Sequence, residues 1–122
     1  MPVEVSTLPI PEDSPSALLY GGAFDPPHIA HLALPPFVRE SIGCERLVYI
    51  PAGAAPMKDG PSVSSDDRLT MLELGLEGIP AVAIATLELE RPGPSYTVDT
   101  LHEIAAKRPD TTLRFLIGAD QA

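Results

Sequence analysis

Residues 17–31, ALLYGGAFDPPHIAH, decide the fold of this 122-residue chain. The apolar run 17–20 stops at Gly21 and Gly22, which is the pattern of a buried strand that ends at a tight turn. A helical pattern then begins near Ile29. A strand, a glycine turn and a helix start, in this order, predict the first unit of an α/β domain.

The alternation of apolar runs and helical patterns continues along the chain. The expected strands are 17–20, 47–50, 82–89 and 113–117, and the expected helices are 29–42, 65–77 and 97–107. Pro35 and Pro36 lie inside the first helix. Since proline in a helix interior costs about 3 kcal/mol or more, we expect a kink there or a helix that begins near Leu34. Strands that alternate with helices in this way predict an α/β fold, with a parallel sheet covered by helices on both faces.

Composition and charge exclude several classes of protein. With 44% apolar residues the chain can build a core, so its 15 prolines predict stiff connections rather than disorder. The 8 Lys and Arg residues against 17 Asp and Glu residues give a net charge of −9, which opposes attraction to nucleic acid and to anionic lipid. No segment approaches the ~20 apolar residues of a membrane-spanning helix. We therefore expect no nucleic-acid partner and no membrane partner.

The cysteine content and the N-terminal segment bear on compartment and domain organisation. Cys44 is the only cysteine, so no intrachain disulfide forms and a cytoplasmic location is expected. Residues 1–16 carry prolines and acidic side chains but no basic cluster or long apolar run, so they resemble neither a signal peptide nor a transit peptide. We expect a flexible, proline-rich tail over 1–16 and one domain over 17–122.

The chemistry is expected at the carboxyl ends of the strands, where α/β sheets bind ligands. Residues 21–31 fall there, but they match neither a dinucleotide fingerprint nor a P-loop. Glycines let backbone N–H groups approach an anion, and a helix start adds a partial positive charge. Three interpretations of His28 and His31 stay open on these residues alone: they hold a triphosphate, they bind a metal ion with Asp25, or they only cap and pack the helix.

The same stretch is similar to the signature of a known family. The pattern Gly-x-Phe-Asp-Pro-x-His-x-x-His over residues 22–31 closely resembles that of the nucleotidyltransferases, and of the nicotinate-nucleotide adenylyltransferases among them. Two departures stand out. Ala30 occupies a position where the family commonly has glycine, and the proline pair 35–36 interrupts a helix that is usually continuous.

Three further segments extend this resemblance. Residues 51–58, PAGAAPMK, resemble a family loop that often ends Pro-x-His-Lys, with Met57 in place of the histidine and Lys58 matching the lysine. A basic side chain on a stiff loop suits a phosphate, although an exposed, solvated lysine is the alternative. Residues 66–72 match a family segment in which Arg68 fits an anion contact and a surface or capping ion pair equally well.

The stretch 95–101, SYTVDTL, discriminates between branches of the family. It resembles a Ser-Tyr-Thr-x-Asp-Thr-Leu segment associated with recognition of the nicotinate ring and its carboxylate. Free N–H groups at a helix start, with the Thr97 hydroxyl, suit such a small anion. The alternative is ordinary helix capping by Ser95 or Thr97.

The resemblance implies a reaction and a set of site residues. The reaction is adenylyl transfer from ATP to nicotinate mononucleotide, which gives deamido-NAD and pyrophosphate, with Mg²⁺ entering with ATP. The implied catalytic residues are His28, His31 and Lys58; the implied ATP-binding residues are Gly21, Gly22, Ala23, Phe24, His28, His31 and Asp120; the implied nicotinate-nucleotide-binding residues are Ser95, Tyr96 and Thr97. The alternatives are another adenylyl or cytidylyl transferase, such as the pantetheine-phosphate branch, and a non-catalytic nucleotide-binding remnant.

The extent of the chain bears on the same resemblance. The family's fold is a Rossmann-like sheet that continues past its Gly-x-Asp segment into a further strand and an Ile-Ser-x-Thr-x-x-Arg-like helix start. Here the chain stops at Ala122, directly after the fourth expected strand. We therefore expect an N-terminal fragment of such an enzyme, truncated within the Rossmann-like domain.

Overall fold

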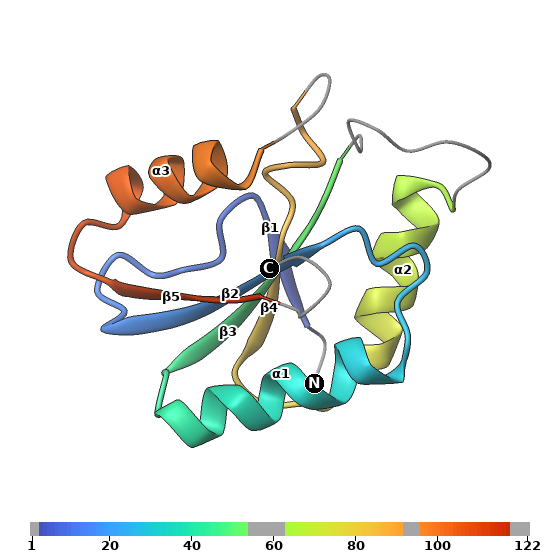
Figure 1. Cartoon of the computed structure of the whole chain (residues 1–122), viewed down its shortest axis with the longest axis horizontal. Helices are drawn as coiled ribbons and strands as arrows, with labels where there is room; N and C mark the ends of the chain where they lie inside the picture. The colour runs from blue at the N-terminus through green and yellow to red at the C-terminus, as the bar shows by residue number, and fades with distance from the viewer. Residues whose placement is uncertain (1–2, 54–62, 92–95, 118–122) are drawn as a thin grey trace.

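The computed structural model describes residues 3–53, 63–91 and 96–117. Within these ranges it has five strands and three helices (Figure 1). In chain order they are β1 (Glu4–Ser6), β2 (Ser16–Gly22), α1 (Ile29–Ile42), β3 (Arg46–Pro51), α2 (Ser65–Leu76), β4 (Val82–Ala85), α3 (Thr97–Lys107) and β5 (Thr112–Leu116).

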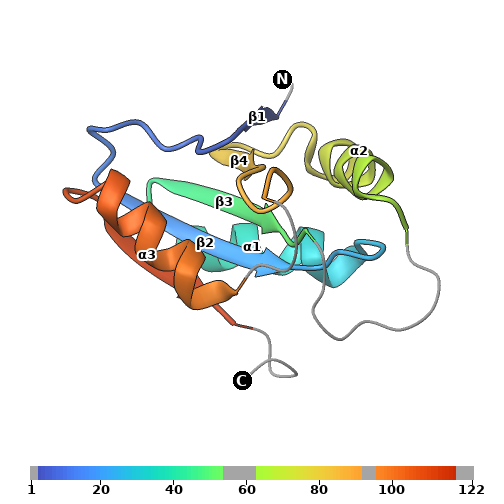
Figure 2. The ribbon, with the colours of Figure 1, turned by 90° about the horizontal axis from the view of Figure 1, so that it is seen from above.

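The five strands form one sheet in the order β1-β4-β3-β2-β5, and every pairing is parallel. Helix α3 covers one face, while α1 and α2 cover the other, as the two perpendicular views show (Figures 1 and 2). The expected α/β architecture, with a parallel sheet between helices, is confirmed. Because all strands run the same way, their carboxyl ends meet at one edge of the sheet.

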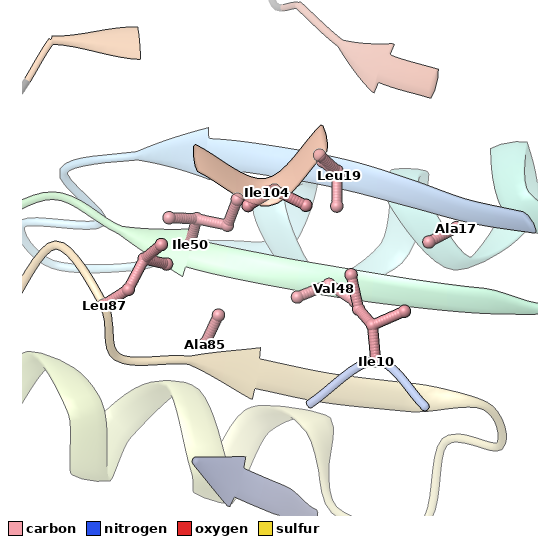
Figure 3. Packing of buried hydrophobic residues seen from close by; sticks show 8 residues of the cluster. All are labelled: Ile10, Ala17, Leu19, Val48, Ile50, Ala85, Leu87 and Ile104. Carbon is pink, nitrogen blue, oxygen red and sulfur yellow. The ribbon is translucent and has the colours of Figure 1, made fainter. Parts of the chain in front are cut away.

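Each face of the sheet has its own apolar core. Successive strand side chains point to opposite faces, so in β2 Leu19 joins the α3 side and Leu18 joins the α1/α2 side. The α3-side core takes in Val48, Ile50 and Ile104, and Figure 3 shows these side chains converging between α3 and the sheet. Burial on both faces explains why the strands read as continuous apolar runs.

Two strand ends differ from the sequence-based expectation. Gly21 and Gly22 are the last residues of β2, paired with Ile50 and Pro51, so the turn begins only at Ala23. The strand expected over 82–89 stops at Ala85, where its pairing with β1 ends, and residues 87–90 turn instead. The apolar character of this turn comes from packing against the core and not from strand pairing, which is why the run reads as a longer strand.

Residues 3–16 belong to the folded domain, which corrects the expected flexible tail over 1–16. Strand β1 pairs in parallel with β4 at the edge of the sheet. Ile10 is only 1% exposed within the α3-side core. The Arg108 Nε–H donates to the Ile10 carbonyl, and the Thr111 hydroxyl donates to the Ser14 carbonyl at 2.8 Å. The segment therefore packs on the domain through paired backbone and buried apolar side chains.

The helix boundaries follow recognisable caps. α2 begins after Ser64, whose hydroxyl accepts a hydrogen bond from the Asp67 N–H at 3.1 Å. α1 ends at Ile42, and its C-cap Gly43 has a φ of 72°, in the left-handed region that favours glycine. α3 spans Thr97–Lys107, as expected from its apolar spacing.

Helix α1 is continuous over Ile29–Ile42 although it contains Pro35 and Pro36, so the expected late start near Leu34 is wrong. The carbonyl of His31 would normally accept from the N–H of residue 35, which proline lacks. The Tyr49 hydroxyl from β3 donates to that carbonyl instead. Burial, together with the neighbouring Tyr20, raises the pKa of the Tyr49 phenol, so the group stays protonated and able to donate.

We predict that Tyr49→Phe lowers the free energy of unfolding by about 1–2 kcal/mol, because the His31 carbonyl loses its donor. In a Pro35→Ala background the N–H restored at position 35 can serve that carbonyl. The same Tyr49→Phe change should then cost less, with a coupling of about 1 kcal/mol. Urea unfolding of the four proteins of this cycle measures the difference. An equal cost in both backgrounds would show that the hydroxyl does not replace the missing helix bond.

Candidate active site

A cavity of about 440 Å³ lies at the carboxyl edge of the sheet, on the side of α3. The ends of β2, β3 and β5, the turn after β4 and the first turn of α3 all contribute to it. Its lining residues are Gly21, Gly22, Ala23, Ile50, Ala52, Glu88, Thr97, Thr100, Leu101, Phe115 and Ile117. The edge at which the sequence predicts chemistry therefore carries a cavity.

The cavity brings together parts of two motifs that are far apart in the sequence. Gly21, Gly22 and Ala23 form one wall, and Thr97, the first residue of α3, lies on another. A Cβ atom added at Gly21 would meet the Phe115 ring only at 3.7 Å. Glycine at this position thus adds no side chain to the cavity wall, although the surrounding atoms would leave room for a Cβ atom.

A hydrogen-bonded network, which sequence reasoning missed, reaches the cavity wall through its buried members Glu88 and Thr100. The Thr100 hydroxyl donates to the Glu88 carboxylate at 2.7 Å, and Glu88 is only 8% exposed. Arg91 donates to the Thr100 hydroxyl at 2.8 Å and to the Glu103 carboxylate. These bonds tie the turn after β4 to α3. The only sequence signal was a Glu and an Arg at the end of an expected strand, and nothing there indicates that both face the same helix.

Glu103, at the outer end of this network, predicts that the stability of the protein depends on pH. The hydrogen bond from Lys107 and then that from Arg91 lower the pKa of Glu103 below its usual 4.5. A carboxylate whose pKa is depressed on folding stabilises the protein above its unfolded pKa, and this contribution is lost as pH falls through the folded pKa. Glu103→Gln should therefore lower stability at pH 7, with the deficit shrinking below about pH 4.5. Urea unfolding from pH 3 to 7 tests this, with the exposed Glu40→Gln as control; a deficit independent of pH would contradict it.

His28 and His31 stack on each other at the start of α1. Their ring centroids are 3.6 Å apart, and the planes differ by 26°. The His28 backbone N–H donates to Nδ1 of His31 at 3.1 Å, so a neutral His31 ring carries its proton on Nε2. His31 thus has the capping role that was one of the open interpretations. Neither histidine is among the residues that line the cavity on the α3 side.

A bed of aromatic rings supports His31. The Phe24 ring meets His31 edge-on at 5.2 Å between centroids, and Tyr20 and Tyr49 pack around Phe24 at 5.5 and 5.7 Å. Phe24 is only 3% exposed and has a φ of 49°. The Phe24 side chain therefore fixes the orientation of the His31 ring, and its backbone takes a strained, left-handed conformation where the chain leaves β2.

The start of α1 carries the positive end of the helix dipole. No acidic residue lies in its first turn, so the helix dipole there is not offset by a side chain of that turn. The first turn of α3 differs, because it carries Asp99. Tyr96, the N-cap of α3, is 54% exposed and makes no side-chain cap. Its position leaves the first N–H groups of α3 without a hydroxyl or carboxylate cap from that residue.

Arg68 is a buried residue that contacts the backbone of two loops. It is 6% exposed, and its guanidinium donates to the carbonyls of Ala23 and Ala52, at 2.6 and 2.8 Å. These carbonyls follow β2 and β3. Arg68 is thus a buried side chain and not a surface residue, and within the described ranges its guanidinium contacts backbone carbonyls.

Several expected site residues fall outside the part of the chain that the structure describes: Lys58, Ser95 and Asp120. Among the described residues, no group of three or more His, Cys, Asp and Glu side chains is placed to hold a metal ion. The described helices also include none that is long and apolar enough to cross a bilayer. His102 is an exposed residue of α3, and Cys44 is a buried free thiol.

Comparison with known sequences agrees with this arrangement. A family model described as cytidylyltransferase-like matches residues 19–122. A protein of Geobacillus thermodenitrificans named "Probable nicotinate-nucleotide adenylyltransferase" is 44% identical over 103 residues, which cover 84% of this chain and 48% of that protein. A protein of Listeria monocytogenes serotype 4a with the same name is 42% identical, over 84% of this chain and 55% of its own length. The chain spans about half the length of the curated relatives it matches.

Solved structures show the same fold. The structure titled "Plasmodium falciparum nicotinic acid mononucleotide adenylyltransferase complexed with NaAD" superposes with a TM-score of 0.71 at 20% identity, over 87% of this chain and 53% of that one. At this identity the likeness concerns the fold. The family match begins within β2 and takes in the glycine edge, both stacked histidines and the first turn of α3. The chain belongs to the cytidylyltransferase-like family.

Proposed function

We propose that this chain carries the active site of a nicotinate-nucleotide adenylyltransferase, which joins nicotinate mononucleotide to the adenylyl group of ATP. The observation that carries the proposal is the stacked pair of His28 and His31 at the start of α1, directly after the glycine edge of β2. The relatives named as nicotinate-nucleotide adenylyltransferases support it.

The proposed reaction needs no protein nucleophile. A phosphate oxygen of nicotinate mononucleotide forms a bond to the α-phosphorus of ATP, and the bond from that phosphorus to the bridging oxygen breaks to release pyrophosphate. The attacking phosphate is already ionised, so no proton has to be removed from it. The protein's task is to align two anions and to stabilise the charge that develops on the transferred group and on pyrophosphate.

The side chains at the start of α1 suit the polyphosphate part of this task. The His31 ring is held by its Nδ1 bond to the His28 N–H and by the aromatic bed beneath it. A preorganised donor of this kind loses little freedom when charge develops next to it. The α1 dipole adds positive potential in the same place, which matters in a chain with a net charge of −9. We propose that Lys58 adds a further charge to the phosphates.

We propose that the other end of the site takes the nicotinate nucleotide. The cavity wall formed by the first turn of α3 includes Thr97, which follows Tyr96, and the N–H groups of that turn, which the Tyr96 side chain does not cap, suit a small carboxylate. Ser95 belongs to the same segment. The cavity volume of about 440 Å³ is within the range of small-molecule sites.

A divalent metal ion, which we propose is Mg²⁺, belongs to this reaction as part of the ATP complex. The described residues do not supply three metal ligands together, so an ion bound mainly by the nucleotide's phosphates fits this site better than one bound by the protein alone. We propose that Asp120 lies beside the nucleotide or an ion-bound water, and that the enzyme works in the cytoplasm.

The experiment offers ATP and Mg²⁺ to the product of the complete gene, together with nicotinate mononucleotide, nicotinamide mononucleotide or phosphopantetheine. Pyrophosphate release and the mass of the product are measured. We expect the fastest turnover with nicotinate mononucleotide, and formation of deamido-NAD. Turnover with phosphopantetheine only would overturn the proposed acceptor. Calorimetric binding of ATP without turnover for any acceptor would replace the enzyme by a nucleotide-binding module.

A further inference from the structure

Arg68 connects α2 to two loops that follow neighbouring strands. Its Nη1 donates to the Ala23 carbonyl at 2.6 Å and to the Ala52 carbonyl at 2.8 Å. Its Nη2 donates to the Ser65 hydroxyl at 3.0 Å and approaches the Gly53 carbonyl at 3.5 Å. These four partners, all in the described part of the chain, are neutral oxygen atoms. Burial lowers the pKa of Arg68. The carbonyl dipoles that accept its hydrogen bonds offset part of the cost of desolvating this guanidinium.

The direction of these carbonyls determines the direction of the next N–H groups. In a planar trans peptide the C=O and the following N–H point in opposite directions. The cis peptide in this region is Asp25–Pro26, so the peptides that follow Ala23 and Ala52 are trans. Because both carbonyls point at Arg68, the N–H groups of Phe24 and Gly53 point away from it.

The two loops that Arg68 contacts also border the cavity. Ala23 and Ala52 both line the cavity, whereas Arg68 does not. Arg68 thus contacts these two loops from outside the cavity that they line. The positive charge of Arg68 sits at the negative ends of two peptide dipoles whose positive ends point away from it, and such an arrangement favours an anion at those positive ends.

A second contact fixes the same loop against α2. The Asp25 carboxylate accepts a hydrogen bond from the Val63 N–H at 2.7 Å, just before the N-terminus of α2. Phe24 lies between this contact and the Arg68-bound carbonyl, in its left-handed conformation. A strained residue persists where its surroundings determine it from both sides, and here both restraints come from the start of α2.

We infer that Arg68 is a positioning residue, which turns the backbone N–H groups of Phe24 and Gly53 toward the cavity so that they donate to phosphate oxygens of the bound nucleotide. This role rests on the proposed function for its ligand, but the orientation of the two peptides does not. Arg68 acts from behind the peptides and does not touch the nucleotide.

The test compares Arg68→Lys with Arg39→Lys in the product of the complete gene. Lysine keeps the charge but cannot bond two carbonyls with the geometry of the guanidinium. Arg39 is a matched control, because its Nη1 also donates to a backbone carbonyl, that of Cys44 at 2.8 Å, beyond the C-terminal end of α1. The probes are ATP with Mg²⁺ and inorganic pyrophosphate, followed by calorimetry and by the amide signals of Phe24 and Gly53 in nuclear magnetic resonance.

We expect pyrophosphate to shift the Phe24 and Gly53 amide signals in the wild-type protein. Arg68→Lys should abolish these shifts and weaken pyrophosphate and ATP binding at least tenfold, while Arg39→Lys should leave binding within twofold. Wild-type amides that do not respond to bound pyrophosphate, or an Arg68→Lys protein that binds as tightly as the wild type, would overturn the inference. Even where Arg68→Lys does not fold, wild-type amides that ignore bound pyrophosphate overturn the inference.

An experiment without ligand distinguishes a failure of this inference from a failure of the proposed function. In a crystal structure of Arg68→Lys without nucleotide, we expect the peptides after Ala23 and Ala52 to rotate from their wild-type orientation. Unchanged peptides would overturn the positioning role alone. A wild-type protein that binds neither ATP nor pyrophosphate would instead overturn the proposed function, and with it the assignment of phosphate as the ligand of these N–H groups.

Discussion

His31→Ala should lower kcat for pyrophosphate release from ATP and nicotinate mononucleotide by about 100-fold or more, the usual effect of removing a preorganised donor to a transition state. The ring is held in place by the His28 N–H and by the edge of Phe24, so little reorganisation is needed when it meets a phosphate. The measurement is steady-state turnover of the complete gene product.

The cap that His31 provides has to be separated from its proposed chemistry. Since Nδ1 accepts the His28 N–H, His31→Ala also removes a helix cap, at a cost of about 1 kcal/mol. His31→Asn places an oxygen near Nδ1 but no donor near Nε2. We therefore expect His31→Asn to recover most of the stability lost in His31→Ala while kcat stays low. His102→Ala, on the exposed face of α3, serves as the control.

A single result would restrict His31 to capping. If His31→Asn turns over as fast as the wild type, the ring's outer nitrogen has no part in the reaction, and the phosphate contacts have to come from elsewhere in the site. Equal losses of kcat in His31→Asn and His31→Ala, with unequal stabilities, are the pattern that the proposed role requires.

The sequence predicts those parts of this molecule that depend on local spacing. α3 is an example, because its apolar positions recur at helical spacing and a basic end followed by Pro109 stops it. The α/β architecture likewise follows from the order of elements. β1 could not be predicted in this way, since it is a three-residue strand whose partner, β4, lies 79 residues further along the chain.

The same limit applies to the candidate site. The histidine pair lies within one local motif, and the sequence predicts it as a unit. The Tyr49 hydroxyl that supports this pair bonds the His31 carbonyl from 18 residues further along the chain. Arg68 reaches Ala23 across 45 residues, so its two-loop contact depends on how α2 packs on the sheet. Such contacts emerge only when the helices are placed.

Gly53→Ala should lower the free energy of unfolding by about 3 kcal/mol, at the upper end of the usual cost of overpacking. A Cβ atom at Gly53 would lie 2.5 Å from the backbone carbonyl oxygen of Glu88, closer than real Cβ contacts come. The neighbour is backbone and not the end of a flexible side chain, so it cannot move aside without shifting the turn after β4. Urea unfolding measures the loss.

Gly21→Ala is the matched stability control, because its added Cβ would meet its nearest neighbours only at 3.7 Å. We expect it to unfold at the wild-type urea concentration or slightly above, since alanine in a strand is favoured over glycine by about 0.5–1 kcal/mol. A Gly53→Ala protein as stable as Gly21→Ala would show that the β3 loop and the turn after β4 are not in the close contact described.

Gly53→Ala should also change the site, because the loop of Gly53 and the turn of Glu88 are each bonded to a different part of it. On one side the carbonyls of Ala52 and Gly53 face Arg68, and on the other side Glu88 is bonded to Thr100 of α3. Separating the two sides would move α3 relative to the glycine edge of β2, and both form walls of the cavity. We therefore expect KM for nicotinate mononucleotide to rise in Gly53→Ala even at temperatures where the protein remains folded. An unchanged KM in a destabilised protein would mean that the contact supports the fold without setting the width of the cavity.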